Sequence, residues 1–217
     1  MKHLLFTRIP KNASVTVISL FEDDTVKILQ NSLGREHIHF AWTNTLFDNS
    51  KPRSLTKLSK SKRKTEEIVE DQKYWDKFYK FCFVRNPYER AISSWKFGSW
   101  KASWDCTFEE YLLKLKDQKD KLSAPFLGDG LIHHSTLQYN YIYNEEGDLK
   151  VDYIGKIENF KQDLAEILEI NNLPQINWLP HRNRTKHRPY DEYYSLETRD
   201  LVDEIYEKDI TTFNYNF

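Results

Sequence analysis

Lys11 lies in the stretch IPKNASVT, between a short apolar run and a segment whose apolar residues have a helical period. Leu4 to Thr7 predicts a strand, and a helix is predicted to begin at Ser14, so Lys11 falls in a strand-to-helix turn. Backbone N–H groups at such a turn lack intrahelical partners, and the helix dipole favours negative charge there. Ala13, Ser14 and Thr16 are small or carry hydroxyls, which lets donors approach an anion. We therefore predict an anion site, although a surface lysine in a connecting loop has the same local sequence.

A second candidate anion site lies in FYKFCFVRNPYERAISSW. This segment predicts a buried strand from Phe78 to Val84, a turn at Asn86, and a helix with Pro87 near its first position. Arg85 ends the strand, and Ser93 follows about two helical turns later. An arginine between a core strand and a helix N-terminus is well placed to bind a phosphate.

Two further basic segments have two open interpretations each. The stretch LPHRNRTKHRPY is either a solvated charge run or a loop that closes over an anionic ligand. The run from Lys57 to Lys64 is either a solvated face, which we favour, or an acceptor-binding patch. His181 and His187, together with the pair His133 and His134, lack a convincing metal-ligand spacing, so we predict no metal.

The stretch GREHIHFAW supplies candidates for a general base. It predicts a strand from His37 to Ala41, and residues two apart in a strand lie on one face, so His37 and His39 share a face that Glu36 does not. Imidazoles suit proton removal near neutral pH. We predict His37 as the base ahead of His39. A pair of packed histidines, or Glu36 as the base, remain alternatives.

The composition indicates one domain, spanning residues 1–217. The chain has 39% hydrophobic residues, enough for one α/β core, and a formal net charge of -1, which does not indicate a nucleic-acid binder. No apolar run is long enough to span a membrane, and we expect neither a signal peptide nor membrane insertion. Cys82 and Cys106 form no disulfide framework or metal spacing, which favours a reducing, cytoplasmic location.

The elements that must position these residues suggest an α/β fold with a mainly parallel sheet flanked by helices. We predict strands at Leu4 to Thr7, His37 to Ala41, Phe78 to Val84, Leu137 to Tyr143 and Val151 to Gly155. We predict helices at Ser14 to Gln30, Tyr88 to Ser99, Thr107 to Asp117, Asn159 to Glu169 and Leu196 to Asp209. Thr107 and Glu110 form a capping box. The first strand and turn are P-loop-like, yet the chain has six glycines and none before Gly34, so an ordinary ATP-binding P-loop is absent.

The two anion motifs, in this order, resemble those of sulfotransferases that use 3′-phosphoadenosine-5′-phosphosulfate (PAPS), specifically the carbohydrate-modifying family that includes heparan 2-O- and chondroitin 4-O-sulfotransferases. IPKNAS is similar to the 5′-phosphosulfate loop, and FVRNPYERAISSW to the 3′-phosphate motif. The similarity continues through VDYIGKIENFKQDLAEIL and the ending YEKDITTFNYNF, so it covers nearly the whole chain. It implies a PAPS-dependent sulfuryl transfer to a hydroxyl of a carbohydrate or glycoconjugate.

The resemblance also implies roles for individual residues. Lys11 would be the electrostatic catalyst, and an H-x-H similar to that of His37 and His39 is implicated in catalysis in the heparan enzyme. His134 and Gln138 would lie near the acceptor. The implied PAPS-binding residues are Arg8, Lys11, Asn12, Ala13, Ser14, Val15 and Thr16 on the 5′ side, Arg85 and Ser93 at the 3′-phosphate, and Arg182, Asn183, Thr185 and Lys186 in the late loop.

Two other classes of protein stay open at this point. A phosphotransferase of P-loop descent would share the strand-to-helix anion site. A catalytically silent module that binds nucleotides or glycans would keep the anion loops but lack a base. The three tryptophans of SSWKFGSWKASW are predicted as core aromatics in preference to sugar-stacking residues.

Overall fold

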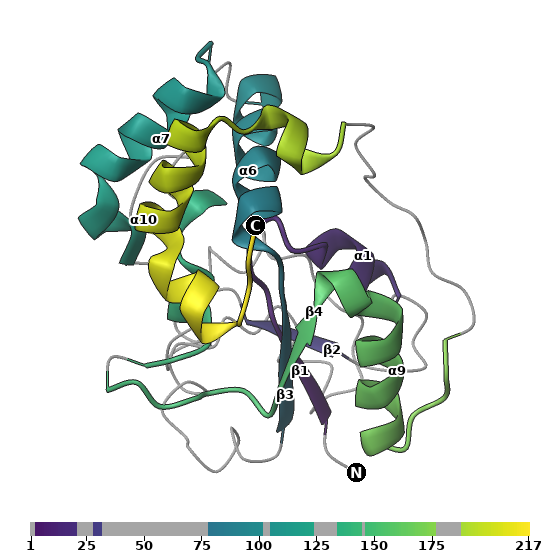
Figure 1. The fold of residues 1–217 in the computed structure, drawn as a ribbon. Coiled ribbons are helices and arrows are strands. Elements are labelled where there is room, and N and C mark those ends of the chain that lie inside the picture. The colour runs from purple at the N-terminus through teal and green to yellow at the C-terminus, as the bar shows by residue number, and fades with distance from the viewer. Residues whose placement is uncertain are drawn as a thin grey trace, which may run out of the picture.

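A four-stranded parallel sheet forms the centre of the protein (Figure 1). The computed structural model describes residues 3–20, 28–31, 78–101, 105–123, 134–144, 146–176 and 188–217. The strands run in the order β2 (Ile28–Asn31), β1 (His3–Thr7), β3 (Phe78–Val84) and β4 (Tyr153–Lys156). Successive residues from Phe81 to Val84 are all buried, as expected for a parallel strand that is covered on both faces. The predicted α/β class is confirmed.

The helices begin where local sequence signals place them. α6 starts at Pro87, and the side chain of Asn86 accepts a hydrogen bond from the Tyr88 N–H at 3.0 Å. Thr107 and Glu110 form the predicted capping box at the start of α7. Within the described ranges the helices are α1 (Ser14–Ser19), α6 (Pro87–Lys101), α7 (Phe108–Asp117), α9 (Phe160–Ile170) and α10 (Leu196–Thr212), with short 3-10 helices η1 (Lys119–Ser123), η2 (Gln138–Tyr141), η3 (Ile157–Asn159) and η4 (Tyr190–Tyr193).

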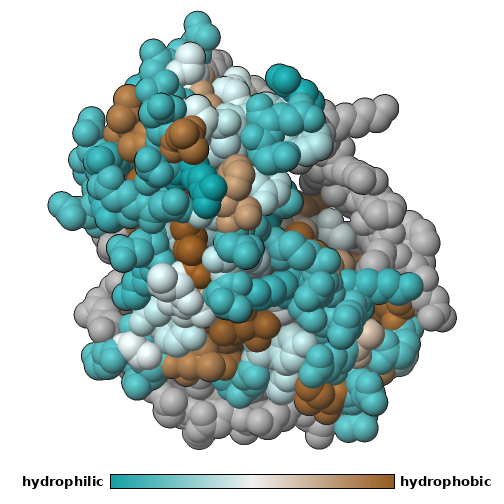
Figure 2. Space-filling view, viewed as in Figure 1, coloured by the Kyte–Doolittle hydropathy of each residue, from teal (hydrophilic) through white to brown (hydrophobic). Residues whose placement is uncertain are grey.

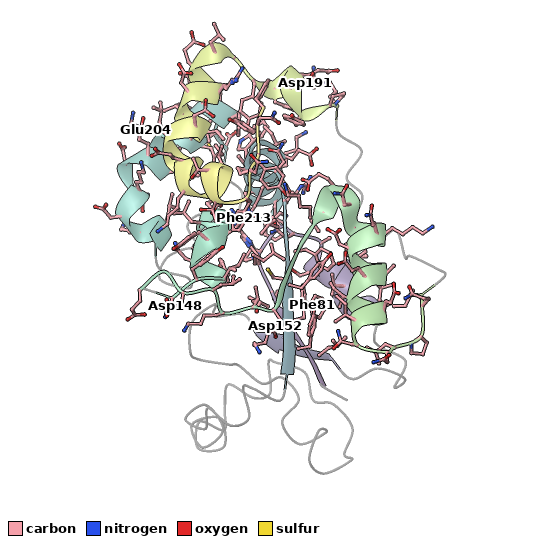
Figure 3. The ribbon with its side chains drawn as sticks, turned by 60° about the horizontal axis from the view of Figure 1, so that its bottom comes forward. Phe81, Asp148, Asp152, Asp191, Glu204 and Phe213 are labelled. Atoms are coloured by element: carbon pink, nitrogen blue, oxygen red, sulfur yellow. The ribbon has the colours of Figure 1, made fainter. Side chains whose placement is uncertain are left out.

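Three groups of buried side chains hold these layers together. On one face of the sheet, Phe81 and Phe83 pack with Val17 of α1 and Leu164 of α9. On the other face, Cys82 and Val84 pack with residues of η2 and with Phe213, which follows α10. A third group joins α6, α7 and α10, which Figure 1 shows gathered away from α9. Figure 3 labels Phe213, which directly follows α10, and Glu204, which lies on the side of α10 that faces α7.

The molecular surface on the face shown in Figure 2 is mostly hydrophilic, and its apolar residues form small separate groups. Among the helices of the described ranges, none has the length and apolar character needed to cross a membrane.

Three predicted elements differ from the structure. The helix predicted to reach Gln30 ends at Ser19, and Ile28–Asn31 instead pairs with β1, because a parallel neighbour satisfies its backbone groups. The strand predicted from Leu137 to Tyr143 is the 3-10 helix η2. The strand predicted from Val151 is β4, which begins at Tyr153. The strand predicted from His37 to Ala41 lies outside the described residues.

The register of the sheet brings the two predicted anion motifs together. β1 and β3 are adjacent and parallel, and Thr7 at the end of β1 pairs with Cys82 near the end of β3. The loops that follow both strands therefore leave the sheet at the same edge, where ligands of parallel α/β sheets bind. Lys11 and Arg85 lie in these two loops.

Candidate active site

Lys11 lies in the loop that joins β1 to α1, with a backbone conformation that is unusual for a side-chain-bearing residue. Lys11 has φ 70° and Ala13 has φ 52°, both in the left-handed region. Such conformations persist only where the surroundings enforce them, and they concentrate at functional sites. The predicted strand-to-helix turn is confirmed, and its backbone has a shape that an isolated loop would rarely adopt.

Contacts on both sides of Lys11 enforce this shape. The carbonyl of Pro10 accepts a hydrogen bond from Arg90 Nε at 3.2 Å. The Asn12 side chain is buried, and its Nδ2 donates to the Phe83 carbonyl at 2.8 Å and to Gln138 Oε1 at 2.6 Å. The loop is thus fixed to α6, to the end of β3 and to η2.

The hydroxyl proton of Ser14 is used inside this loop. Ser14 Oγ donates to the Ile9 carbonyl at 2.9 Å, and the Asn12 N–H turns back to the same carbonyl at 3.4 Å. The sequence predicted both residues as contacts to an anion. The structure assigns these two donors to holding the loop.

The ammonium group of Lys11 lies in a partly buried, positively charged environment. Its Nζ is 4.1 Å from the ring centroid of Phe97 on α6. Burial, and to a smaller extent the nearby charges of Arg85 and Arg90, together lower the pKa of Lys11 to about 8. Burial also lowers the pKa of the Arg8 guanidinium. A site that destabilises its own cations in this way is complementary to an added anion.

Arg85 follows β3 and reaches the Lys11 loop. Its Nη1 donates to the Lys11 carbonyl at 3.4 Å, while Nε and Nη2 donate to Glu89 Oε2 at 3.2 and 3.1 Å. The two predicted anion sites therefore meet, and Glu89, in the first turn of α6, partly neutralises Arg85. Glu89 also lines an open cavity of about 640 Å³ together with Arg188, Tyr190 and Phe217, a volume within the usual range for ligand pockets.

His134 and Gln138 occupy different environments, although the sequence predicted both near the acceptor. The His134 ring packs edge-on against Phe97, with centroids 4.5 Å apart, so it shares one aromatic ring with Lys11. Gln138 is fully buried, and both atoms of its side-chain amide bond to protein groups. The acceptor contact predicted for Gln138 is therefore wrong, because its side chain has no exposed surface.

Other predicted residues lie on or beside α1 and α6. Val15 is exposed, Thr16 and Ser93 are partly buried, and the hydroxyl of Ser94 donates to the His134 carbonyl at 2.8 Å. Trp95 is a packing residue, as predicted, with its ring 5.4 Å from that of Phe108. Residues 36, 37 and 39, the run at 57–64, His133, and the late-loop residues Arg182, Asn183, Thr185 and Lys186 lie outside the described residues.

Sequence reasoning missed the face of α6 that supports the site. Arg90, Ser94 and Phe97 each contact the Lys11 loop or the segment at His134. Their spacing of four and then three residues places them on one helical face, a pattern that the sequence does contain. Arg90 is almost completely buried, which is rare for an arginine. An arginine on the same helical face as Ser94 and Phe97 was the sequence feature that could have indicated a supporting role for this face.

Comparison with known proteins relates the whole chain to one family. A family model described as the sulfotransferase family matches residues 1–216. The crystal structure of a sulfotransferase from Alicyclobacillus acidocaldarius superposes with a TM-score of 0.51 at 11% identity, covering 100% of this chain and 98% of that one, which is a likeness of fold. An uncharacterized protein of Archaeoglobus fulgidus is 26% identical over 105 residues, 48% of this chain and 76% of that protein.

Proposed function

The chain belongs to the sulfotransferase family, and from this premise we propose that it transfers a sulfuryl group from PAPS to a hydroxyl of a carbohydrate or glycoconjugate. One observation carries the proposal. Lys11, in an enforced left-handed conformation, and Arg85, whose guanidinium donates to the Lys11 carbonyl, place two cations at one edge of the parallel sheet. This arrangement suits a ligand with anionic groups at two positions.

The proposed reaction is an in-line displacement at sulfur. The acceptor oxygen forms a bond to sulfur, the bond from sulfur to the bridging phosphate oxygen breaks, and that oxygen keeps the electron pair. A general base takes the acceptor proton. Lys11 would stabilise the charge that develops on the bridging oxygen, since a fixed cation in a partly buried site acts most strongly on developing charge. Arg85 would hold the 3′-phosphate and position the donor.

The donor and the reaction can be tested together. We expect calorimetric titration to give tight binding of PAPS and of its product 3′,5′-ADP, and weaker binding of ATP. We expect labelled PAPS to yield 3′,5′-ADP only with a hydroxyl-bearing acceptor, which a panel of glycans would identify. Transfer of phosphate from ATP would instead establish a phosphotransferase. Tight PAPS binding with no turnover across the panel would support a silent binding module.

Arg85→Ala is expected to remove the preference of the protein for 3′,5′-ADP over 5′-AMP. A charge-assisted hydrogen bond is worth about 1.5–3 kcal/mol, so the preference should fall roughly 10- to 100-fold, as measured by calorimetry. Turnover at saturating PAPS should change less, because a 3′-phosphate contact is present in both the ground state and the transition state.

Two matched variants separate the guanidinium from its ion pair. Glu89→Gln removes the carboxylate partner of Arg85 but keeps the guanidinium, so the preference for 3′,5′-ADP should persist. Lys116→Ala removes a positive charge from an exposed pair with Glu204, between α7 and α10, and should leave binding unchanged. An unchanged nucleotide preference in Arg85→Ala would show that the 3′-phosphate lies elsewhere.

A further inference from the structure

Gln138 makes a hydrogen-bonded bridge between the two loops of the site. Its Oε1 accepts from Asn12 Nδ2 at 2.6 Å and from the Arg85 N–H at 2.9 Å, and its Nε2 donates to the Arg85 carbonyl at 2.9 Å. The side chain is completely buried. One amide group thus fixes the residue after Lys11 and both backbone groups of Arg85.

The helix that carries Gln138 is itself held from the C-terminal part of the chain. The backbone N–H groups of Gln138 and Tyr139 donate to the two carboxylate oxygens of Asp209, each at 2.8 Å. Asp209 belongs to α10 and is fully buried. Burial raises the pKa of this carboxyl, whereas the charge of Arg90 and the two N–H donors oppose that shift. Gln138 therefore projects from an anchored segment.

Arg90 ties the same segment to the other side of Lys11. Its Nη2 donates to the Thr136 carbonyl at 2.8 Å, and its Nε to the Pro10 carbonyl at 3.2 Å. The segment 134–138 is therefore linked to both neighbours of Lys11. Arg90 connects it to Pro10, and Gln138 connects it to Asn12. Arg90 is also one of the largest buried side chains, so its replacement would disturb the core. Replacement of Gln138 therefore acts more directly on the Lys11 loop.

We propose that Gln138 is a positioning residue for Lys11, which ties the Lys11 loop to the backbone of Arg85 and fixes the relative position of the two cations. The effect of this bridge on catalysis rests on the sulfuryl transfer proposed above. Its effect on the position of Lys11 does not depend on that reaction. Without it, Asn12 loses its side-chain acceptor and the left-handed backbone at Lys11 loses one of its constraints.

The test measures the environment of Lys11 without using activity. Competitive acetylation followed by mass spectrometry gives the reactivity of each lysine against pH. In the wild type, Lys11 should titrate with a pKa near 8. In Gln138→Met, which keeps the length of the side chain and removes its hydrogen bonds, the loosened loop should let the ammonium reach water. The pKa of Lys11 should then rise, and its reactivity at pH 8 should fall roughly tenfold for each unit of that rise.

Asn171→Ala is the matched control. Asn171 is also a buried amide, and it donates to the Ile167 carbonyl at 2.7 Å at the end of α9, away from the Lys11 loop. Its loss should lower the thermal midpoint but leave the titration of Lys11 unchanged. An unchanged Lys11 titration in folded Gln138→Met would overturn the proposal. If Gln138→Met unfolds, Asn12→Ala removes the same bridge from the loop side and must raise the pKa of Lys11 for the proposal to stand.

Turnover provides a second readout, linked to the proposed function. Gln138→Met should lower turnover about tenfold or more in the wild-type background and have little further effect in Lys11→Ala, since a residue that acts through Lys11 has nothing left to position. Equal losses in both backgrounds would contradict the positioning role. A wild-type protein that is inactive with PAPS would contradict the proposed function alone, because the acetylation result would still decide the role of Gln138.

Discussion

Lys11→Ala is expected to lower turnover about 10²- to 10³-fold, the usual consequence of removing one preorganised electrostatic group, while weakening binding of 3′,5′-ADP much less. The ammonium group lies in a partly buried site beside Phe97 and near two arginines, so it should interact most strongly with charge that appears only in the transition state. Steady-state kinetics with saturating PAPS measure the loss, and calorimetry measures binding. Turnover within a few-fold of the wild type would remove Lys11 from the mechanism.

The pH dependence provides a second readout for Lys11. The proposed role requires the ammonium form of Lys11. Burial, with the nearby charges of Arg85 and Arg90, lowers the pKa of Lys11 to about 8, so kcat/KM for PAPS, which reports on the unliganded enzyme, should fall as pH rises above about 8. A bound anion favours the charged form and should move this limb to higher pH when PAPS saturates. Lys11→Arg should lack the limb, because arginine stays charged throughout this range.

Lys11→Met separates lost chemistry from lost structure. The folded-state pKa of Lys11 is below its unfolded value of 10.5, so the unfolded chain binds more protons between about pH 8 and 10.5. The buried charge therefore destabilises the fold below pH 8, and this penalty decreases as pH rises through that window. An inactive Lys11→Met with a thermal midpoint at or above that of the wild type would attribute the loss to the missing cation.

Elements with strong local signals could be predicted from the sequence. The apolar run at Phe78–Val84 gave the observed strand β3, Pro87 begins α6, and Thr107 caps α7. The two helix starts depend on contacts within a few residues, whereas β3 was recognisable because its run is mostly apolar. Ile28–Asn31 had no such signal, because it becomes a strand only through pairing with β1.

Long-range contacts decided the remaining details of the site. The segment at Gln138 has an apolar pattern suited to a strand, yet a carboxylate 71 residues away, on Asp209, caps it as a 3-10 helix. That turn buries Gln138 and gives it a supporting role. The convergence of Lys11 and Arg85, in contrast, followed from a general property of parallel sheets, whose strand ends meet at one edge. The residue types predicted an anion site at Lys11 and Arg85. Tertiary contacts determined that Gln138 bonds to other protein groups and supports that site instead of facing a ligand.

His37→Ala is expected to lower turnover by about 10²- to 10⁴-fold, the usual contribution of a positioned general base, with PAPS affinity intact. This prediction comes from the sequence GREHIHFAW, in which two histidines share one face of a predicted strand. His39→Ala should lose somewhat less. The pH profile of turnover should lose its acidic limb in the variant that lacks the base, because protonation of the proposed imidazole base would inactivate the enzyme at low pH.

His134 is the internal comparison for this assignment. Its ring packs against Phe97, and its carbonyl is held by Ser94, so its contacts are those of a packing residue near Lys11. His134→Ala should therefore raise KM for the acceptor or lower stability while keeping the acidic limb of the pH profile. Loss of that limb in His134→Ala alone would make His134 the base. Near-normal rates in His37→Ala and His39→Ala, combined with an inactive Glu36→Gln, would assign the role to Glu36. Removal of the proton from the acceptor hydroxyl requires the general base, so the variant that lacks the base is the one that loses activity.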